Sequence, residues 1–268
     1  PPLPFERDLS VVGPMARTVR DAVTVFDAIA GYDPQDSLSV NYAIARAPKR
    51  YTEALDRDGL KGARLGLVTN ALGADGDVHA APVNALVRAA VQSMTACGAR
   101  VEEVQIADLA LHLRDTSMYV NCSRHDLDAF LGAQRDAPMR SLRQLYEARQ
   151  YHPMLDLFEA CLAGPELPEY DPQYFRRLAA REAFQRQIVN LMAAQRLDAL
   201  VFPDVQIVPP TRAQLDGRVW TTLTYPTNTL IASQAWLPAI TVPAGFAGER
   251  LPVGLELMGK PYDEATLF

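Results

Sequence analysis

The sequence predicts an α/β protein with a mixed, mostly parallel β-sheet that is covered by helices on both faces. Three observations support this fold class. A strand–helix–strand pattern spans residues 63–106, a helical pattern fills most of 107–197, and further apolar strands follow position 197. Because strands that are buried on both faces are apolar without alternation, these short runs are typical of a sheet between helical layers.

The first element is an amphipathic helix over residues 18–30. Thr18 is a suitable N-cap and Asp21 stands three positions later, as in a capping box. Gly31 is expected in the left-handed position after the helix, and Pro34 prevents its continuation. The residues predicted to face the core are Val19, Ala22, Val23, Phe26 and Ile29. A well-capped structural helix accounts for this pattern without any functional role.

A βαβ unit follows. Residues 63–70 are an apolar run after Gly62, residues 82–96 have one apolar helical face, and residues 99–106 form a second strand. Pro82 suits the first helical turn and Gly98 suits the position just after the helix. Parallel strands need such a crossover, so we expect these two strands to be parallel.

The region 107–197 is almost entirely helical in pattern, and its longest helix covers 173–196. Residues 198–203 are a buried strand, and residues 238–246 and 252–259 are two more strands joined by a polar turn. The loop 203–222 is the longest irregular stretch, and such loops often carry binding sites. We expect residues 1–268 to form a single domain.

Composition narrows the functional class. The chain of 268 residues is 49% hydrophobic and 22% charged, with a net charge of −6 and no dense Lys/Arg run, which argues against nucleic acid or an anionic membrane as partner. Three scattered cysteines give no disulfide framework, so a cytoplasmic location is expected. No apolar run is long enough to span a bilayer, and the first ten residues lack the features of a signal peptide.

Motifs for common chemistries are missing from the sequence. It has no glycine-rich phosphate loop, no G-x-S-x-G elbow, and no HExxH or CxxC metal motif. Cys122 and His125 are three apart on a predicted helix and could form a nucleophile pair, although a buried structural cysteine is the better interpretation. Asp204 could act as a base or ligand, or simply be solvated. Trp220, Tyr225 and Trp236 fit either core packing or the wall of an apolar pocket.

Three segments carry a family resemblance. "DLSVVGPMARTVRDAVTVFDAIAGYDPQD" (8–36) resembles the segment that follows the signature region in the amidase signature family. "LPAITVPAGFAGERLPVGLELMGKPYDEATLF" (237–268) is similar to the C-terminal block of that family. "DALVFPD" (198–204) resembles a third landmark, although a threonine is more usual where Asp204 stands. The three segments occur in the family's order.

The resemblance implies an amidase that acts on linear carboxamides through a Ser–cis-Ser–Lys triad and an acyl-enzyme, with no metal or organic cofactor. In the family, the triad and the Gly-Ser-rich oxyanion loop precede the GPMARTV segment (13–19). No residue here matches them: Ser10 has the wrong context and Lys49, Lys61 and Lys260 lie in turn-like stretches. We therefore expect no catalytic residue in this segment, and expect it to be the C-terminal portion of an amidase, inactive alone.

What the segment can supply is scaffold and substrate pocket. The pocket residues we expect from position and residue type are Met15, Tyr119, Asn121, Trp220, Tyr225, Asn228 and Trp236. The expected partners are a small-molecule amide substrate, the missing N-terminal portion and, in addition, a second copy in a homodimer. Hydrolysis and ammonia transfer to an acceptor both stay open.

Two other classes remain as alternatives. One is a non-catalytic subunit or degenerate homologue that binds without turnover, which an upstream Ser-Ser-Lys set would eliminate. The other is a stand-alone α/β ligand-binding domain, which would need a sheet without exposed edges.

Overall fold

The computed structural model describes residues 11–45, 47–248 and 250–268. The chain divides into two compact units. The first is built mainly from Ala110–Ala183 and Pro210–Tyr225, and the second from Gly13–Leu109, Phe184–Pro209 and Pro226–Phe268. Each unit is described separately below, and the single domain expected from the sequence stays a prediction.

The second unit contains a five-stranded sheet of order β2-β1-β3-β5-β4. Its strands are β1 (Arg64–Val68), β2 (Arg100–Val104), β3 (Ala199–Pro203), β4 (Ala239–Ala247) and β5 (Leu251–Met258). β1 pairs in parallel with β2 and β3, whereas β5 is antiparallel to both β3 and β4. Four strands therefore point the same way, and the mixed, mostly parallel sheet predicted from the sequence is confirmed.

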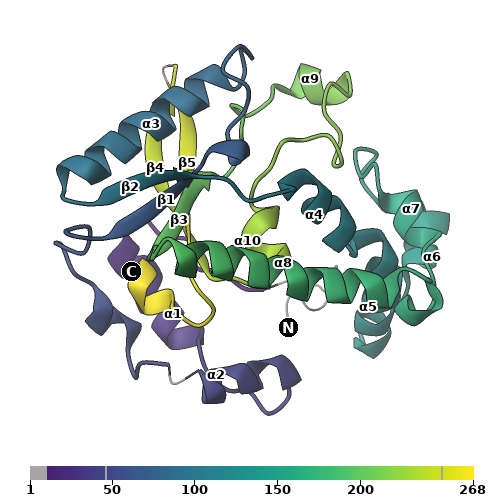
Figure 1. Cartoon of the computed structure of the whole chain (residues 1–268). Coiled ribbons are helices and arrows are strands. Elements are labelled where there is room, and N and C mark those ends of the chain that lie inside the picture. Colours follow the sequence, from purple (N-terminus) through teal and green to yellow (C-terminus); the bar gives the residue numbers. More distant parts are fainter. Residues whose placement is uncertain (1–10, 46, 249) are drawn as a thin grey trace. The chain divides into compact units, whose positions relative to one another are not determined.

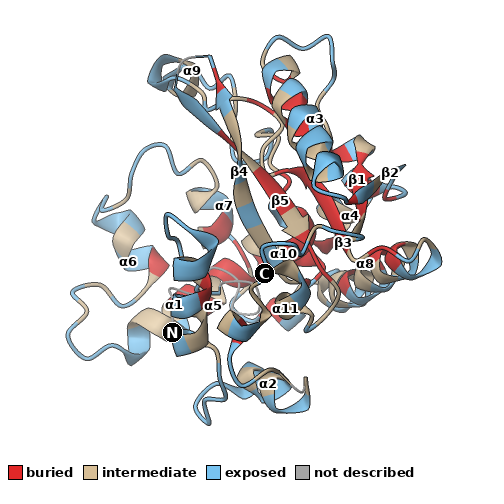
Figure 2. Cartoon of the chain, turned by 90° about the vertical axis from the view of Figure 1, so that its left-hand side faces the viewer, coloured by how far each residue is buried: buried red, intermediate tan, exposed pale blue. Residues whose placement is uncertain are grey.

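Helices cover both faces of this sheet. On one face, Leu67, Val201 and Leu255 are in one core cluster with Val83 and Val87 of α3 (Ala81–Ala96). The opposite face has the fully buried Leu200, Phe202 and Met258, and buried residues from α10 (Leu230–Gln234) and the second half of α8 (Tyr174–Ala194) complete that layer. Figure 2 shows the resulting burial, with β1, β3 and β5 largely red. The central strands are buried because each side has its own helical layer.

The N-terminal helix of the second unit is α1 (Val19–Ile29). Thr18 caps it, since its hydroxyl accepts a hydrogen bond from the Asp21 backbone N–H at 3.1 Å. The expectation for Gly31 is wrong: α1 ends at Ala30 in an extended conformation, and Gly31 is not among the residues of positive φ. Gly98, in contrast, has φ of +100° just after α3, a backbone conformation that favours glycine.

Both ends of the second unit meet in one aromatic cluster. Phe26 of α1 lies 4.9 Å from Tyr51 and 5.5 Å from Phe268 between ring centroids, all in edge-to-face geometry. Phe268 follows α11 (Glu264–Leu267), and Figure 1 shows the yellow α11 beside the purple α1. Edge-to-face rings at these distances add stabilisation beyond their buried area. This unit also contains α2 (Val40–Ile44).

The first unit is helical, as the pattern over 107–197 predicts. Its helices are α4 (Leu109–Thr116), α5 (Tyr119–Ala133), α6 (Leu142–Glu147), α7 (Phe158–Leu162), the first half of α8, and α9 (Arg212–Asp216). A small core of Leu127, Leu142 and Cys161 joins α5, α6 and α7. α9 lies inside the loop expected to be irregular, and a capping box between Thr211 and Gln214 starts it.

Candidate functional site

The candidate site in the second unit lies at the carboxyl ends of β1 and β3. In open α/β sheets, ligands bind outside the carboxyl ends of the strands, where loops leave the sheet. After β1 the chain makes the short helix Thr69–Ala71, and after β3 it enters the loop that begins at Asp204. These two strands are neighbours in the sheet, so their following loops are brought to the same edge.

Asn228 fixes this edge. Its side-chain amide donates to the carbonyl oxygens of Ala71 and Pro203, each at 2.7 Å, and only 2% of the residue is exposed. Its backbone N–H donates to the carbonyl of Asp204 at 2.7 Å, and its Oδ1 accepts from Gln206 at 3.2 Å. The buried Asn228 thus connects the segment after β1, the end of β3 and the start of the loop that follows β3. Its role in the second unit is to hold this edge together.

An acidic pair lies beside this position. The carboxyl group of Glu256 on β5 is hydrogen-bonded to the carboxyl group of Asp204, and the Thr241 hydroxyl on β4 donates to Asp204 Oδ1 at 2.8 Å. Glu256 is 4% exposed, and burial together with the charge of Asp204 raises its pKa to about 9. A carboxyl group that is protonated at neutral pH can donate a hydrogen bond, which an ionised one cannot.

The other two expected pocket residues of the second unit lie elsewhere. Met15 precedes α1 and is 98% exposed. Trp236 follows α10, is 40% exposed, and adopts a φ of +52°. Because β4 begins just after Trp236 and runs parallel to β3, Trp236 lies at the amino edge of the sheet, opposite Asn228. The structure does not bring these two residues together with Asn228 at one edge.

The four expected residues of the first unit differ in their surroundings. Asn121 is buried, and its amide donates to Asp171 Oδ2 at 2.8 Å and to the Pro168 carbonyl. Tyr119 packs against the core of α5 and α7, and burial raises its pKa. Burial also raises the pKa of Tyr225, and Trp220 is half-buried. Asn121 therefore has a structural use, while the three aromatic residues are partly accessible.

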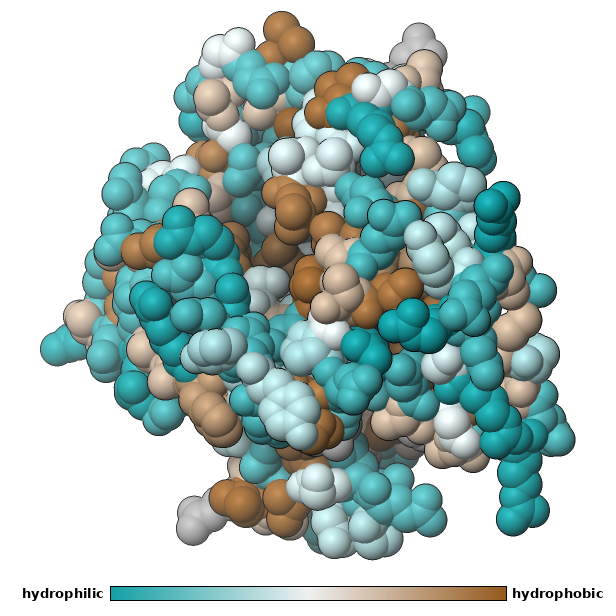
Figure 3. Space-filling model, turned by 90° about the vertical axis from the view of Figure 1, so that its right-hand side faces the viewer, coloured by the Kyte–Doolittle hydropathy of each residue, from teal (hydrophilic) through white to brown (hydrophobic). Residues whose placement is uncertain are grey.

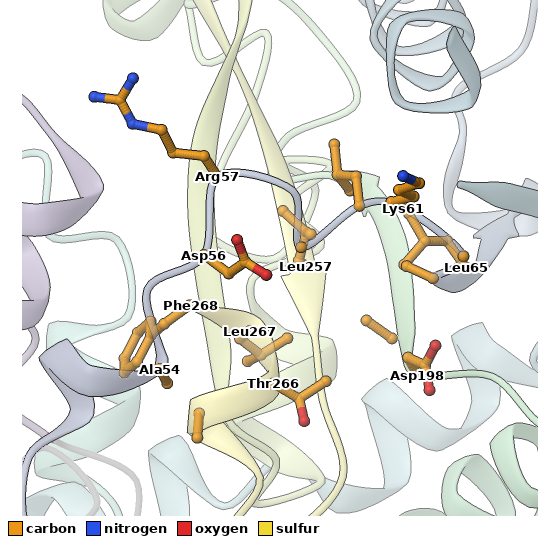
Figure 4. A pocket seen from close by; sticks show the side chains of 16 residues that line it. Ala54, Asp56, Arg57, Lys61, Leu65, Asp198, Leu257, Thr266, Leu267 and Phe268 are labelled. Carbon is orange, nitrogen blue, oxygen red and sulfur yellow. The ribbon is translucent and has the colours of Figure 1, made fainter. Parts of the chain in front are cut away.

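Each unit has an open cavity. That of the second unit measures about 560 Å³ and lies at the amino edge of the sheet, where Asp198, Leu257 and Phe268 contribute to its wall. Figure 4 shows Asp56 between the apolar side chains while Arg57 points away. That of the first unit measures about 860 Å³ and is lined by Tyr146, Tyr151 and Arg218 among others. None of the seven expected pocket residues lines either cavity.

The hydrogen bonds of Cys122 and His125 lead to other residues than those of a nucleophile pair. The Cys122 thiol donates to Asn121 Oδ1 at 3.4 Å, and the His125 ring lies 2.9 Å from Asp126 Oδ1. Cys122 is buried, as the structural interpretation requires. Among the described residues, no group of three or more histidine, cysteine and acidic side chains is placed to hold a metal ion, and no helix is long and apolar enough to cross a membrane.

Sequence reasoning missed Glu256. The feature of the sequence that could have identified it is an acidic residue inside the apolar stretch "VGLELM", since this stretch forms a mostly buried strand. Asp204 was singled out, but its partner lies on a different strand far along the chain. Only the pairing of β3 with β5 brings the two acids together.

Comparisons with known proteins give one consistent family. The family model described as Amidase matches residues 1–268. The chain is 27% identical to the A subunit of glutamyl-tRNA(Gln) amidotransferase from Thermosynechococcus vestitus, covering 98% of this chain and 54% of that protein. It is 31% identical to the protein of the same name from Anaeromyxobacter sp. (strain K), with the same coverage of both chains.

Solved structures agree with this family. The native peptide amidase from Stenotrophomonas maltophilia matches with a TM-score of 0.75 and 30% identity, over 99% of this chain and 53% of that one. The chain therefore spans about half the length of the proteins it matches.

Proposed function

The chain belongs to the amidase family, and on this premise we propose that it supplies scaffold and substrate pocket to an amide hydrolase. The hydrolase would act on linear carboxamides, and its Ser–cis-Ser–Lys triad would lie on a portion that precedes this segment. The observation that carries the proposal is the family match over residues 1–268, combined with coverage of only 54% of the amidotransferase relatives. The half of those relatives left unmatched leaves room for the missing triad.

The proposed reaction is acyl transfer. A neutral lysine takes a proton through the bridging serine, and the nucleophilic serine attacks the amide carbonyl carbon. Backbone N–H groups stabilise the oxyanion, and the lysine returns its proton through the bridging serine to the nitrogen, which leaves as ammonia or an amine. Water then hydrolyses the acyl-enzyme and releases the carboxylic acid. This chain would contribute a rigid sheet whose carboxyl edge is held by Asn228, because a catalytic loop needs a fixed support.

The substrate contacts remain a proposal. Among the seven residues expected from the sequence, the amides of Asn121 and Asn228 are already engaged by protein acceptors, so we assign them to positioning. Met15, Tyr119, Trp220, Tyr225 and Trp236 remain as proposed contacts, because each keeps an accessible surface. Apolar and aromatic surfaces of this kind suit the side of a substrate away from its amide.

A second candidate is ammonia transfer within a larger complex. Both amidotransferase relatives are named as one lettered subunit of an enzyme, which favours a role as one component of several. A hydrolase releases ammonia from a simple carboxamide on its own. A transferase component would need its partner subunits for efficient turnover.

The test uses the full natural protein and a serine-directed fluorophosphonate, with the labelled residue located by mass spectrometry. We expect one labelled serine outside residues 1–268, and ammonia release from simple carboxamides or peptide amides. The isolated segment should show neither labelling nor turnover. Stoichiometric labelling at any residue of 1–268 would overturn the proposal, and turnover of glutamine only with added subunits would favour the second candidate.

A further inference from the structure

Three strands of the second unit place two carboxyl groups and a hydroxyl on one face of the sheet. In the register of the sheet, Glu256 of β5 lies between Phe202 of β3 and Thr241 of β4. Asp204 follows β3 directly, and its backbone N–H donates to the carbonyl of Gly254 at 3.3 Å. Side chains two positions apart on a strand share a face, so Asp204 and Glu256 are diagonal neighbours.

Gly254 makes room for this arrangement. A Cβ at Gly254 would overlap the Asp204 carboxylate and would lie 2.8 Å from Thr241 Cγ2. Without a side chain at Gly254, Asp204 can extend across β5 and accept the Thr241 hydroxyl at 2.8 Å, while its carboxyl group also meets Glu256. Asp204 thereby joins β3, β5 and β4.

A hydrogen bond between two carboxyl groups requires a proton, because an ionised carboxylate only accepts. Glu256 is 4% exposed, so its carboxyl group is largely removed from bulk solvent. No other residue of β3, β4, β5 or α10 is titratable. In the part of α8 that belongs to the second unit, the only charged residue is Arg186, which is exposed. The helices α3 and α11 also contact β4, and they carry Arg88 and Glu264. Among the described residues, the charge that raises the pKa of Glu256 is that of Asp204.

We propose that Asp204 and Glu256 share one proton and form a pH-sensitive tie between β3, β5 and the edge strand β4. With the proton in place, the pair holds the three strands together at the carboxyl edge. Loss of the proton leaves two adjacent negative charges in a mostly apolar environment, which repel each other and loosen β4. This inference concerns the sheet alone and does not depend on the amide chemistry proposed above.

The direction of the pH effect follows from the shift of Glu256. Its pKa rises from an ordinary 4.5 to about 9, because burial and the Asp204 charge disfavour ionisation. Between those values the folded chain holds a proton that the unfolded chain has released. The stability contributed by this proton is complete below about pH 4.5 and is lost as pH rises to about 9.

The experiment compares variants of the full natural protein by thermal unfolding between pH 5 and pH 10. Glu256→Gln supplies an amide that donates to Asp204 without titrating, so its melting temperature should change less above pH 7 and exceed the parent value at pH 9. Asp204→Asn, which donates to Glu256 instead, should weaken the pH dependence in the same direction. Glu103→Gln, at an exposed position on β2, is the matched control and should follow the parent.

A direct readout of the proton makes the test independent of folding yield. Infrared spectra of protein with ¹³C-labelled glutamate side chains should show a protonated carboxyl band at pH 7 that disappears near pH 9. The band should be absent from Glu256→Gln and present in Glu103→Gln. If the parent shows only ionised glutamates at pH 7, or if Glu256→Gln keeps the parent's alkaline loss of melting temperature, the shared proton is refuted.

Discussion

Asn228 shows at the residue scale how one polar side chain can hold a sheet edge. Its side-chain amide donates to the backbone carbonyl oxygens of Ala71 and Pro203, and only 2% of the residue is exposed. We predict that Asn228→Ala lowers the free energy of unfolding by about 2 to 3 kcal/mol, since two buried carbonyls lose their partner. Urea denaturation of the full natural protein measures this loss as a lower midpoint with an unchanged slope.

Asn190→Ala is the matched control for this prediction. Asn190 lies on an exposed position of α8, so its replacement should leave the unfolding midpoint near the parent value. If both variants change the midpoint equally, Asn228 has no special structural role. The sequence pointed to Asn228 for its position near a strand end. It could not show whether the amide faces a ligand or the backbone, because that depends on two loops from distant parts of the chain.

The element scale is where sequence patterns predict most. The apolar runs at 63–70, 99–106 and 198–203 became β1, β2 and β3, and the helix expected over 82–96 became α3. These elements depend on local periodicity and on burial of a whole face, which a sequence displays directly. The loop over 203–222 was harder, since α9 has only five residues and its capping box is its main local signal.

The cap of α1 gives a prediction at this scale. Thr18 accepts the Asp21 backbone N–H, and its hydroxyl donates to the Asp21 carboxylate at 2.8 Å. Thr18→Ala should lower the free energy of unfolding by about 1 kcal/mol, the usual cost of removing an N-cap side chain. Thermal or urea unfolding of the full natural protein provides the measurement.

The control for the cap lies on the same helix. Thr24 is exposed, and its hydroxyl donates a hydrogen bond to the Arg20 carbonyl one turn earlier in the helix. Because alanine has a higher helix propensity than threonine, Thr24→Ala should be neutral or slightly stabilising. An equal loss in both variants would mean that the cap contributes nothing beyond the threonine side chain itself.

At the scale of the whole molecule, the edges of the sheet are the decisive feature. Within the described residues, β2 and β4 end the sheet. β2 exposes the charged Arg100, Glu102 and Glu103, which discourage further pairing. β4 has nine residues without a charge, and Phe246 on it is 63% exposed. The two edges therefore differ, and β4 is the one suited to another strand.

Burial along the strands supports the same distinction. The runs "LGLV" and "ALVF" are buried throughout, and "VGLEL" is mostly buried, as the sequence predicts. "AITV" was expected to be equally covered, yet Ala239 and Thr241 are exposed. The sequence identifies this run as apolar. Whether its side chains are buried depends on what packs against β4, and among the described residues nothing buries Ala239 and Thr241. Apolar surface is also visible as brown patches on the face shown in Figure 3.

The last prediction concerns assembly. Residues 1–268 cover about half of the proteins they match, and their longest uncharged strand lies at an open edge. Uncharged open edges pair promiscuously, and large exposed apolar surfaces favour association. We therefore predict that residues 1–268 expressed alone give aggregated or poorly packed material. Co-expression with the portion encoded upstream should yield soluble, active protein.

Size-exclusion chromatography and thermal unfolding separate the outcomes of this experiment. Ala239→Lys, at an exposed position on β4, would add an edge charge and should reduce aggregation of the isolated segment, whereas Glu103→Lys on the already charged β2 should not. Such a rescue would locate the association at β4, the edge predicted to receive the upstream portion. A monodisperse monomer of unsubstituted 1–268 with a sharp cooperative melt would contradict the prediction. It would also favour a self-sufficient ligand-binding domain, because such a domain needs no partner to close its sheet.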